Sequence, residues 1–126
     1  MPKKFNSVEE RRAYWRAWYE NNKDREDYKA SNKATKKRIK KERRSWYLEF
    51  KSTLQCEHCK IDDFRVLDFH HRDPSMKIKE VSLLALSAAS KEKILSEIEK
   101  CKVLCSNCHR IEHWKEKSVL EENVLE

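Results

Sequence analysis

Two pairs of cysteines constrain the fold of this chain more than any other feature of its sequence. Cys56 and Cys59 are separated by two residues, and so are Cys105 and Cys108. This gap lets both thiolates of a pair bind one tetrahedral ion at about 2.3 Å, and four sulfurs fill the coordination shell of zinc. We therefore predict a closed, structural Zn²⁺ site that clamps together two segments with 45 residues between them.

Composition explains why such a chain needs a metal. Of its 126 residues only 38% are hydrophobic and 40% are charged, so apolar burial alone would leave a domain of this size marginally stable. Glycine is absent, and turns must therefore depend on Asn, Asp and two prolines. The fifth cysteine, Cys101, stands outside both pairs, and we expect it to be a small buried residue beside a strand.

Positive charge is concentrated at the start of the chain. The first 50 residues carry 16 Lys/Arg and 8 Asp/Glu, whereas the remainder carries 13 and 14. Such a basic segment favours a polyanionic partner, and we predict double-stranded DNA. A solvated helix face or a disordered arm would give the same run of charge. The residues expected to contact phosphates are Lys33, Lys36, Lys37, Arg38, Lys40, Lys41, Arg43 and Arg44.

The hydrophobic pattern predicts short elements in two regions. A capping box, Ser7 to Glu10, starts a first helix that the Asn21-Asn22 pair should break or bend, and a second, basic helix follows. The expected elements after the first helix are a helix over 24–54, strands over 64–69 and 102–105, helical pieces over 81–86 and 90–100, and a last helix from Ser106 or Asn107 to about Lys117. We divide the chain into a basic helical DNA-binding extension, 1–53, and a folded domain, 54–126.

Membrane association is not expected. The chain has no run of about 18 apolar residues, and its start lacks the apolar core of a signal peptide. We predict a cytoplasmic protein, in the host cell if a phage encodes it. In that compartment cysteines are better suited to holding metal than to forming disulfides.

Four of the five histidines form two groups. His70 and His71 end the first predicted strand, where successive side chains point to opposite sides. His109 and His113 lie one turn apart on the last helix and offer two ligands from one face. A one-metal phosphodiesterase needs an ion on an open site and a neutral imidazole as general base. One histidine of the first pair would complete the ion site and the other would be the base, and spacing leaves the assignment open.

These segments resemble the HNH nuclease family, in its zinc-stapled phage and mobile-element branch. The resemblance covers roughly residues 54–117 and is carried by 56–59, 67–74 and 100–113. It implies a small α+β fold, the ββα-metal (His-Me finger) nuclease domain with a Cys₄ zinc site, preceded here by basic helices. The implied function is that of a metal-dependent DNA endonuclease, which hydrolyses phosphodiester bonds to leave a 5′-phosphate.

The resemblance also implies roles for the histidines. His71 corresponds to the general base, and His70, His109 and His113 correspond to ligands of the catalytic ion. Arg72 or Arg110 could steady the phosphate. A homodimer for two-strand cleavage, or contact with phage packaging proteins, is left open by the sequence.

Two departures from the family pattern affect the metal. The middle asparagine of the family has no clear counterpart near Lys100 and Cys101, and His109 stands where relatives carry asparagine. The family pattern favours Mg²⁺ or Mn²⁺ as the catalytic ion. Because three imidazoles form a softer site than Asp and Asn, Ni²⁺ or Zn²⁺ also stays open. The alternative function is a non-catalytic zinc-ribbon DNA-binding module. A third interpretation is a basic partner-binding helix attached to a degenerate nuclease domain.

Overall fold

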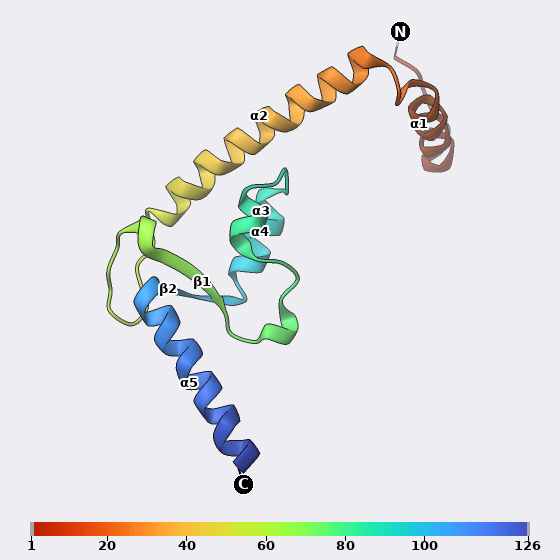
Figure 1. Ribbon diagram of the computed structural model, residues 1–126. Helices are drawn as coiled ribbons and strands as arrows, with labels where there is room; N and C mark the ends of the chain where they lie inside the picture. The colour runs from red at the N-terminus through yellow and green to blue at the C-terminus, as the bar shows by residue number, and fades with distance from the viewer. Residues whose placement is uncertain (1, 126) are drawn as a thin grey trace. The chain divides into compact units, whose positions relative to one another are not determined.

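The computed structural model describes residues 2–125, and the side chains of residues 2–122. Over these residues it contains five α-helices and a two-stranded antiparallel sheet, which confirms the predicted α+β class (Figure 1). Two 3₁₀ turns, η1 and η2, precede and follow the first strand. The elements are α1 (Val8–Asn22), α2 (Glu26–Lys51), η1 (Phe64–Val66), β1 (Leu67–His71), η2 (Pro74–Met76), α3 (Val81–Ala85), α4 (Lys91–Ile98), β2 (Cys101–Cys105) and α5 (Ser106–Leu125).

The chain forms two compact units, residues 1–38 and 39–126, and α2 contributes to both. The predicted division at residue 53 concerns function and stays a prediction. For the described residues, no helix is both long enough and apolar enough to span a membrane.

The helix boundaries of the first unit follow from local hydrogen bonds. Ser7 caps α1, and its Oγ accepts from the Glu10 N–H at 3.0 Å. Glu10 Oε2 accepts in turn from the Asn6 N–H at 2.7 Å, one residue earlier than in a standard capping box. At the other end α1 stops at Asn22, whose side-chain amide donates to the Trp18 carbonyl at 2.6 Å. The predicted break at the asparagine pair is confirmed.

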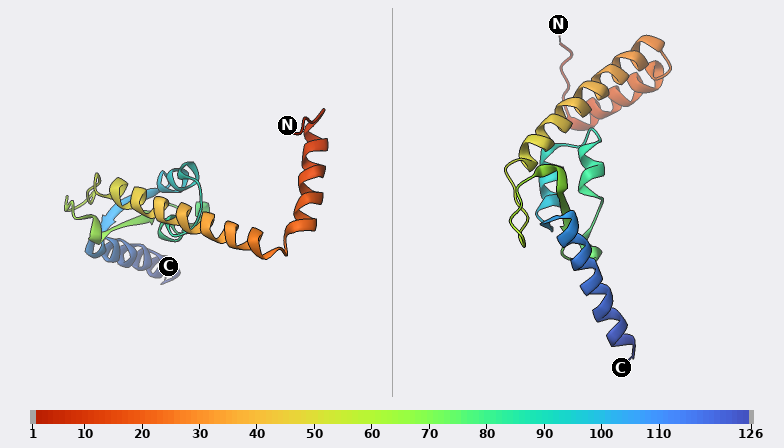
Figure 2. Two further views of the ribbon diagram at one scale, coloured as in Figure 1. Left: turned by 90° about the horizontal axis from the view of Figure 1, so that it is seen from above. Right: turned by 60° about the vertical axis from the view of Figure 1, so that its left-hand side comes forward.

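The sheet of the second unit sets the geometry of everything that follows. β1 pairs antiparallel with β2, from Leu67 opposite Cys105 to His71 opposite Cys101. Because side chains alternate along a strand, His70 faces α5 and His71 faces α4. The two helices lie on opposite sides of this two-stranded sheet (Figures 1 and 2).

The first strand begins later than predicted. The expected strand over 64–69 is instead a 3₁₀ turn followed by β1. Asp63 explains the shift, because its carboxylate accepts from the Arg65 N–H at 3.0 Å and caps the turn. The second strand, β2, begins at Cys101, one residue before the predicted start, and α5 runs beyond the predicted Lys117.

Two small cores hold the second unit together. The larger lies between the sheet, α3, α4 and the end of α2, and includes Tyr47, Phe69, Ile94 and Cys101. Cys101 is buried, as expected. The smaller core surrounds the cysteine pairs and consists of Cys56, Leu67, Leu104 and Cys105, with Leu54, Val66, Val103 and Cys108 packed against them. With so few apolar residues buried, additional stabilisation from a metal is expected.

Candidate metal centres

The first cysteine pair lies on a tight turn that the sheet holds in place. The Cys56 N–H donates to the Ile61 carbonyl at 2.8 Å, and the Glu57 N–H donates to the Val103 carbonyl at 2.9 Å. Lys60 closes the turn with φ of 67°. That conformation normally favours glycine, and a chain without glycine must place a side chain there at some cost.

The four cysteine sulfurs meet as the spacing predicts. Those of Cys56, Cys59, Cys105 and Cys108 lie within 4.8 Å of one another, and the Cys59 and Cys105 sulfurs are 3.6 Å apart. The second pair sits at the junction of β2 and α5, where the Cys108 N–H donates to the Cys105 Sγ at 3.5 Å.

The pKa values of these thiols conflict with one another in the absence of a bound cation. Burial raises the pKa of Cys56, but backbone hydrogen bonds from Cys105, Cys59 and His58 outweigh it and lower that pKa to about 6. Contact with the Cys105 thiol, together with burial, raises the pKa of Cys108 to about 12. Four sulfurs this close cannot all be ionised alone, and a divalent ion would remove the conflict by deprotonating them. The cluster could hold a structural metal such as zinc.

Three histidines form a second cluster. Nitrogen atoms of His70, His109 and His113 lie within 4.8 Å of one another. The ring centroids of His70 are 5.0 Å from those of His109 and 4.7 Å from those of His113, and the two rings on α5 are 4.6 Å apart. The strand therefore supplies one imidazole and the helix supplies two.

A carboxylate orients the first helical histidine. Asp68, two residues before His70 on the same face of β1, has its Oδ2 at 3.1 Å from His109 Nδ1. This leaves His109 Nε2 facing His113 Nε2 at 2.9 Å. A carboxylate on the outer nitrogen of an imidazole is the usual support for a metal-binding histidine.

Glu116 adds an acidic group to the same cluster. Its Oε1 lies 2.9 Å from His70 Nε2, and its Oε2 lies 3.7 Å from His113 Nδ1. His70, Glu112 and Glu116 form a second set that could hold an ion and shares His70 with the first. Glu112 also pairs with Lys102 at 2.9 Å, which leaves it less available as a ligand.

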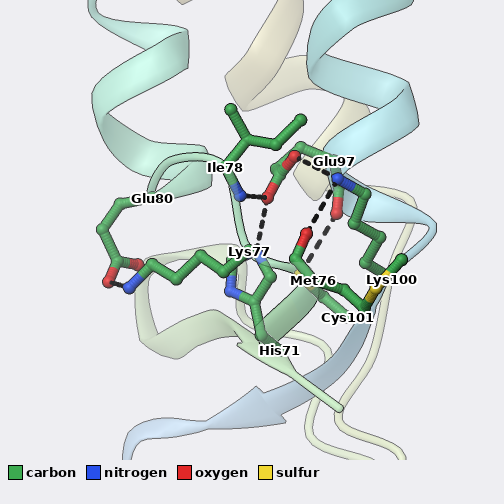
Figure 3. A network of polar contacts seen from close by, with 8 residues as sticks. All are labelled: His71, Met76, Lys77, Ile78, Glu80, Glu97, Lys100 and Cys101. Atoms are coloured by element: carbon green, nitrogen blue, oxygen red, sulfur yellow. Dashed lines mark hydrogen bonds and ion pairs between the residues drawn. The ribbon is translucent and has the colours of Figure 1, made fainter. Parts of the chain in front are cut away.

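His71 is held on the opposite face of the sheet. Its Nε2 lies 2.8 Å from Glu97 Oε1, and both side chains are buried, with exposed fractions of 6% and 3%. Figure 3 shows the Glu97 carboxylate between His71, the backbone of Ile78 and the ammonium group of Lys100. None of the described residues hydrogen-bonds the other ring nitrogen, Nδ1.

One pocket unites the four predicted histidines. It has a volume of about 160 Å³ at the carboxyl end of β1. The remaining wall is formed by Phe69, Pro74, Lys77 and Glu80. Although His70 and His71 point to opposite faces of the sheet, both line this pocket, because it lies where β1 ends.

The cationic residues that were predicted to contact DNA phosphates differ in their exposure and contacts. Of the eight on α2, Arg43 is half-buried and the other seven are exposed. Arg72 is exposed but already has two partners, because it donates to the Glu99 carbonyl at 3.4 Å and lies 3.7 Å from the Glu57 carboxylate. Arg110 is exposed at the start of α5, and His58 is exposed on the cysteine turn.

Three carboxylates of this region were missed at the level of sequence. Asp68 could have been found, because alternation places it on the same face of β1 as His70. Glu116 lies three residues after His113 and was within reach of the same helical argument. Glu97 gave no signal, because its contact with His71 depends on how residues 72–96 return to the sheet.

No protein-family model, curated protein sequence or solved structure matches this chain.

Proposed function

We propose that this chain is a metal-dependent DNA endonuclease of the HNH type, with β1, β2 and α5 as its ββα-metal element. The observation that carries the proposal is the shared pocket of His70, His71, His109 and His113, separate from the cysteine cluster. A zinc ribbon needs the four cysteines alone. It gives no reason for three convergent imidazoles with a buried fourth beside them.

His70, His109 and His113 would hold the catalytic ion in this proposal. The convergence of their ring nitrogens and the support of His109 by Asp68 fit a site for a divalent transition metal. Such an ion supplies electrostatic stabilisation of the scissile phosphate and of the leaving oxygen. Three protein ligands leave positions open for substrate, unlike the four sulfurs.

His71 would be the general base. Its Nδ1 accepts a proton from water while the water oxygen bonds to phosphorus and the bond from phosphorus to the 3′ oxygen breaks. The 3′ oxygen leaves with the bond electrons and takes up a proton from solvent, and His71 later releases its own proton to solvent. Burial of the ring holds it in one position, as a base acting on a bound water requires.

Double-stranded DNA is the proposed substrate, because the basic residues of α2 are mostly exposed and offer phosphate contacts. The test is nicking of supercoiled plasmid by the full chain loaded with one equivalent of zinc. Mg²⁺, Mn²⁺, Ni²⁺ and a second equivalent of Zn²⁺ are added in separate reactions. We expect nicking with at least one of them, and loss of about 10²- to 10⁴-fold in rate for His71→Ala.

His58→Ala is the matched control, since His58 is exposed on the cysteine turn and outside the pocket. It should nick at the wild-type rate. Tight plasmid binding without nicking in any metal would favour the zinc-ribbon alternative. Equal rates for His71→Ala and wild type would remove His71 from the base role.

A further inference from the structure

Glu97 is a buried carboxylate with three hydrogen-bond donors around it. Its Oε1 accepts from the Ile78 N–H at 3.0 Å and lies 2.8 Å from His71 Nε2, and its Oε2 accepts from Lys100 Nζ at 2.9 Å (Figure 3). Its exposed fraction is 3%. An anion is buried in this way only when it is well compensated.

The proton in the contact between His71 and Glu97 can be assigned. Burial raises the pKa of Glu97, but hydrogen bonds from Lys100, Ile78 and His71 outweigh it and lower that pKa to about 2. Glu97 is therefore ionised at neutral pH and has no proton to donate. The hydrogen between the two groups must come from His71 Nε2.

We propose that Glu97 is the positioning residue of the nuclease site, holding His71 as the Nε2–H tautomer with Nδ1 free to accept the proton of water. This inference rests on the proposed function and names a residue that acts through the base. A neutral imidazole carries one hydrogen, so fixing it on Nε2 leaves the lone pair on Nδ1. In the Ser-His-Asp triad of serine proteases, loss of the carboxylate that holds the histidine leaves the imidazole in the wrong tautomer.

The same carboxylate also holds part of the pocket wall. Lys100 Nζ bridges Glu97 to the Met76 carbonyl at 3.1 Å, and Glu97 accepts from the Ile78 N–H. Lys77, between those two residues, lines the pocket together with His71. One buried group therefore fixes both the tautomer of the base and the segment opposite it.

A purely structural ion pair between Glu97 and Lys100 would predict a loss of stability without a specific effect on His71. The experiment separates the two roles with Glu97→Gln, which keeps the shape of the side chain and can present its amide N–H to His71 Nε2. That contact favours the Nδ1–H tautomer. Glu92→Gln, an exposed residue of the same helix, is the matched control for the lost charge.

The readouts are ¹⁵N NMR of histidine-labelled full chain and plasmid nicking kinetics. We expect wild type and Glu92→Gln to show His71 as Nε2–H. In Glu97→Gln we expect the proton on Nδ1, and kcat lower by about 10²- to 10⁴-fold at an unchanged KM. An Nδ1–H signal in the wild type, or an unchanged kcat in Glu97→Gln, would overturn the assignment. If the wild type does not nick DNA, the proposed function fails, while the NMR spectrum still decides the tautomer.

An independent observation in the first unit carries a second inference. Arg11, Arg12, Trp15, Arg16 and Tyr19 surround a shallow hollow of about 390 Å³ on α1, here called the α1 basic-aromatic face. Trp15 and Tyr19 are 53% and 49% exposed. Among the described residues, the three arginines form no ion pair.

Helical spacing makes this face one continuous surface. Arg11, Trp15 and Tyr19 follow each other at intervals of four residues, and Arg12 and Arg16 form the adjacent row. Arg12 and Arg16 are four residues apart and their like charges repel each other, and a bound polyanion would relieve this repulsion. Exposed aromatic rings among arginines suit bases that are free to stack and phosphates beside them.

We propose that the α1 basic-aromatic face binds single-stranded nucleic acid by stacking unpaired bases on Trp15 and Tyr19. The test is fluorescence anisotropy of the full chain with a labelled oligothymidine of about 12 nucleotides and with a duplex of equal length. Trp114→Ala is the matched control, since Trp114 is 69% exposed on α5.

We expect Trp15→Ala to weaken binding of the single strand by about tenfold and to leave its salt dependence unchanged. Arg12→Gln should reduce the salt dependence instead. Equal weakening for the duplex, or no weakening, would contradict the proposal. A Trp15→Ala variant that changes the sedimentation of the protein alone would assign the face to a second copy of the chain.

Discussion

The cysteine cluster and the histidine cluster share one helix, α5, but are built in different ways. Both use residues of α5, and Cys108 of one set is followed directly by His109 of the other. The cysteines are surrounded by Leu67, Leu104 and other apolar residues of the smaller core. The histidines are surrounded by carboxylates and open into a pocket.

This difference separates stability from chemistry. Four sulfurs packed among apolar side chains suit an ion that is bound once, on folding. Three imidazoles, one of them oriented by Asp68, leave room for substrate and suit an ion that takes part in a reaction. The neighbouring positions of Cys108 and His109 allow the two functions to be tested by single substitutions.

The largest expected effect is on the cysteine side. Cys108→Ala should unfold the second unit, because structural zinc contributes on the order of 10 kcal/mol to the folding of small domains. Circular dichroism and zinc analysis of the purified variant would measure this. If Cys108→Ala keeps both its bound zinc and a cooperative melting transition, the cluster is not the stabilising one.

A second prediction concerns the support of the histidine cluster. Asp68→Asn should weaken binding of the added divalent ion by about 10- to 100-fold, since it removes the charge behind His109. Isothermal titration with Mn²⁺ on zinc-loaded protein measures the affinity. Asp62→Asn, an exposed acidic residue nearby in sequence, is the control. Equal Mn²⁺ affinities for Asp68→Asn and Asp62→Asn would show that Asp68 does not support the metal site.

The third prediction is a pH dependence of stability due to Glu97. Its pKa is about 2 in the folded chain against an ordinary value of 4.5. The carboxylate therefore stabilises the fold fully above about pH 4.5, and this contribution is lost as the pH falls towards 2. Acid also releases metal from cysteines, in wild type and variant alike.

The difference in melting temperature between wild type and Glu97→Gln isolates the carboxylate. It should be largest above pH 4.5 and should narrow as the pH falls towards 2. A difference in melting temperature that stays constant over this pH range would mean that the Glu97 pKa is not lowered by folding.

The smallest expected effect is at the cysteine turn. Lys60→Gly should stabilise the chain by up to about 1 kcal/mol, because glycine adopts the positive φ of 67° without the steric penalty of a side chain. Denaturant unfolding of zinc-loaded protein measures the change. A clear loss of stability would show that the contact of Lys60 Nζ with the Glu57 carbonyl at 3.0 Å outweighs the backbone strain.

Local spacing explains which parts of this molecule could be predicted. The cysteine pairs and the two histidines on α5 are set by intervals of three and four residues. Strand alternation correctly separated His70 from His71. In contrast, the start of β1 depends on one hydrogen bond, in which the Asp63 carboxylate caps the preceding turn. The pattern of apolar residues contains no information about that bond.

Contacts between distant segments could not be predicted in the same way. Glu97 lies 26 residues after His71 and reaches it only because α4 leads into β2 with Cys101 opposite His71. No period in the sequence links the two. The catalytic roles of the histidines, the DNA partner and the domain division at residue 53 stay predictions.

The most direct test of the separation between the two clusters is plasmid nicking by the His109→Ala/His113→Ala double variant loaded with one equivalent of zinc. We predict that it melts within a few degrees of the wild type and has lost nicking in every metal that supports the wild type. Nicking at the wild-type rate, or loss of the bound zinc together with the fold, would contradict the account.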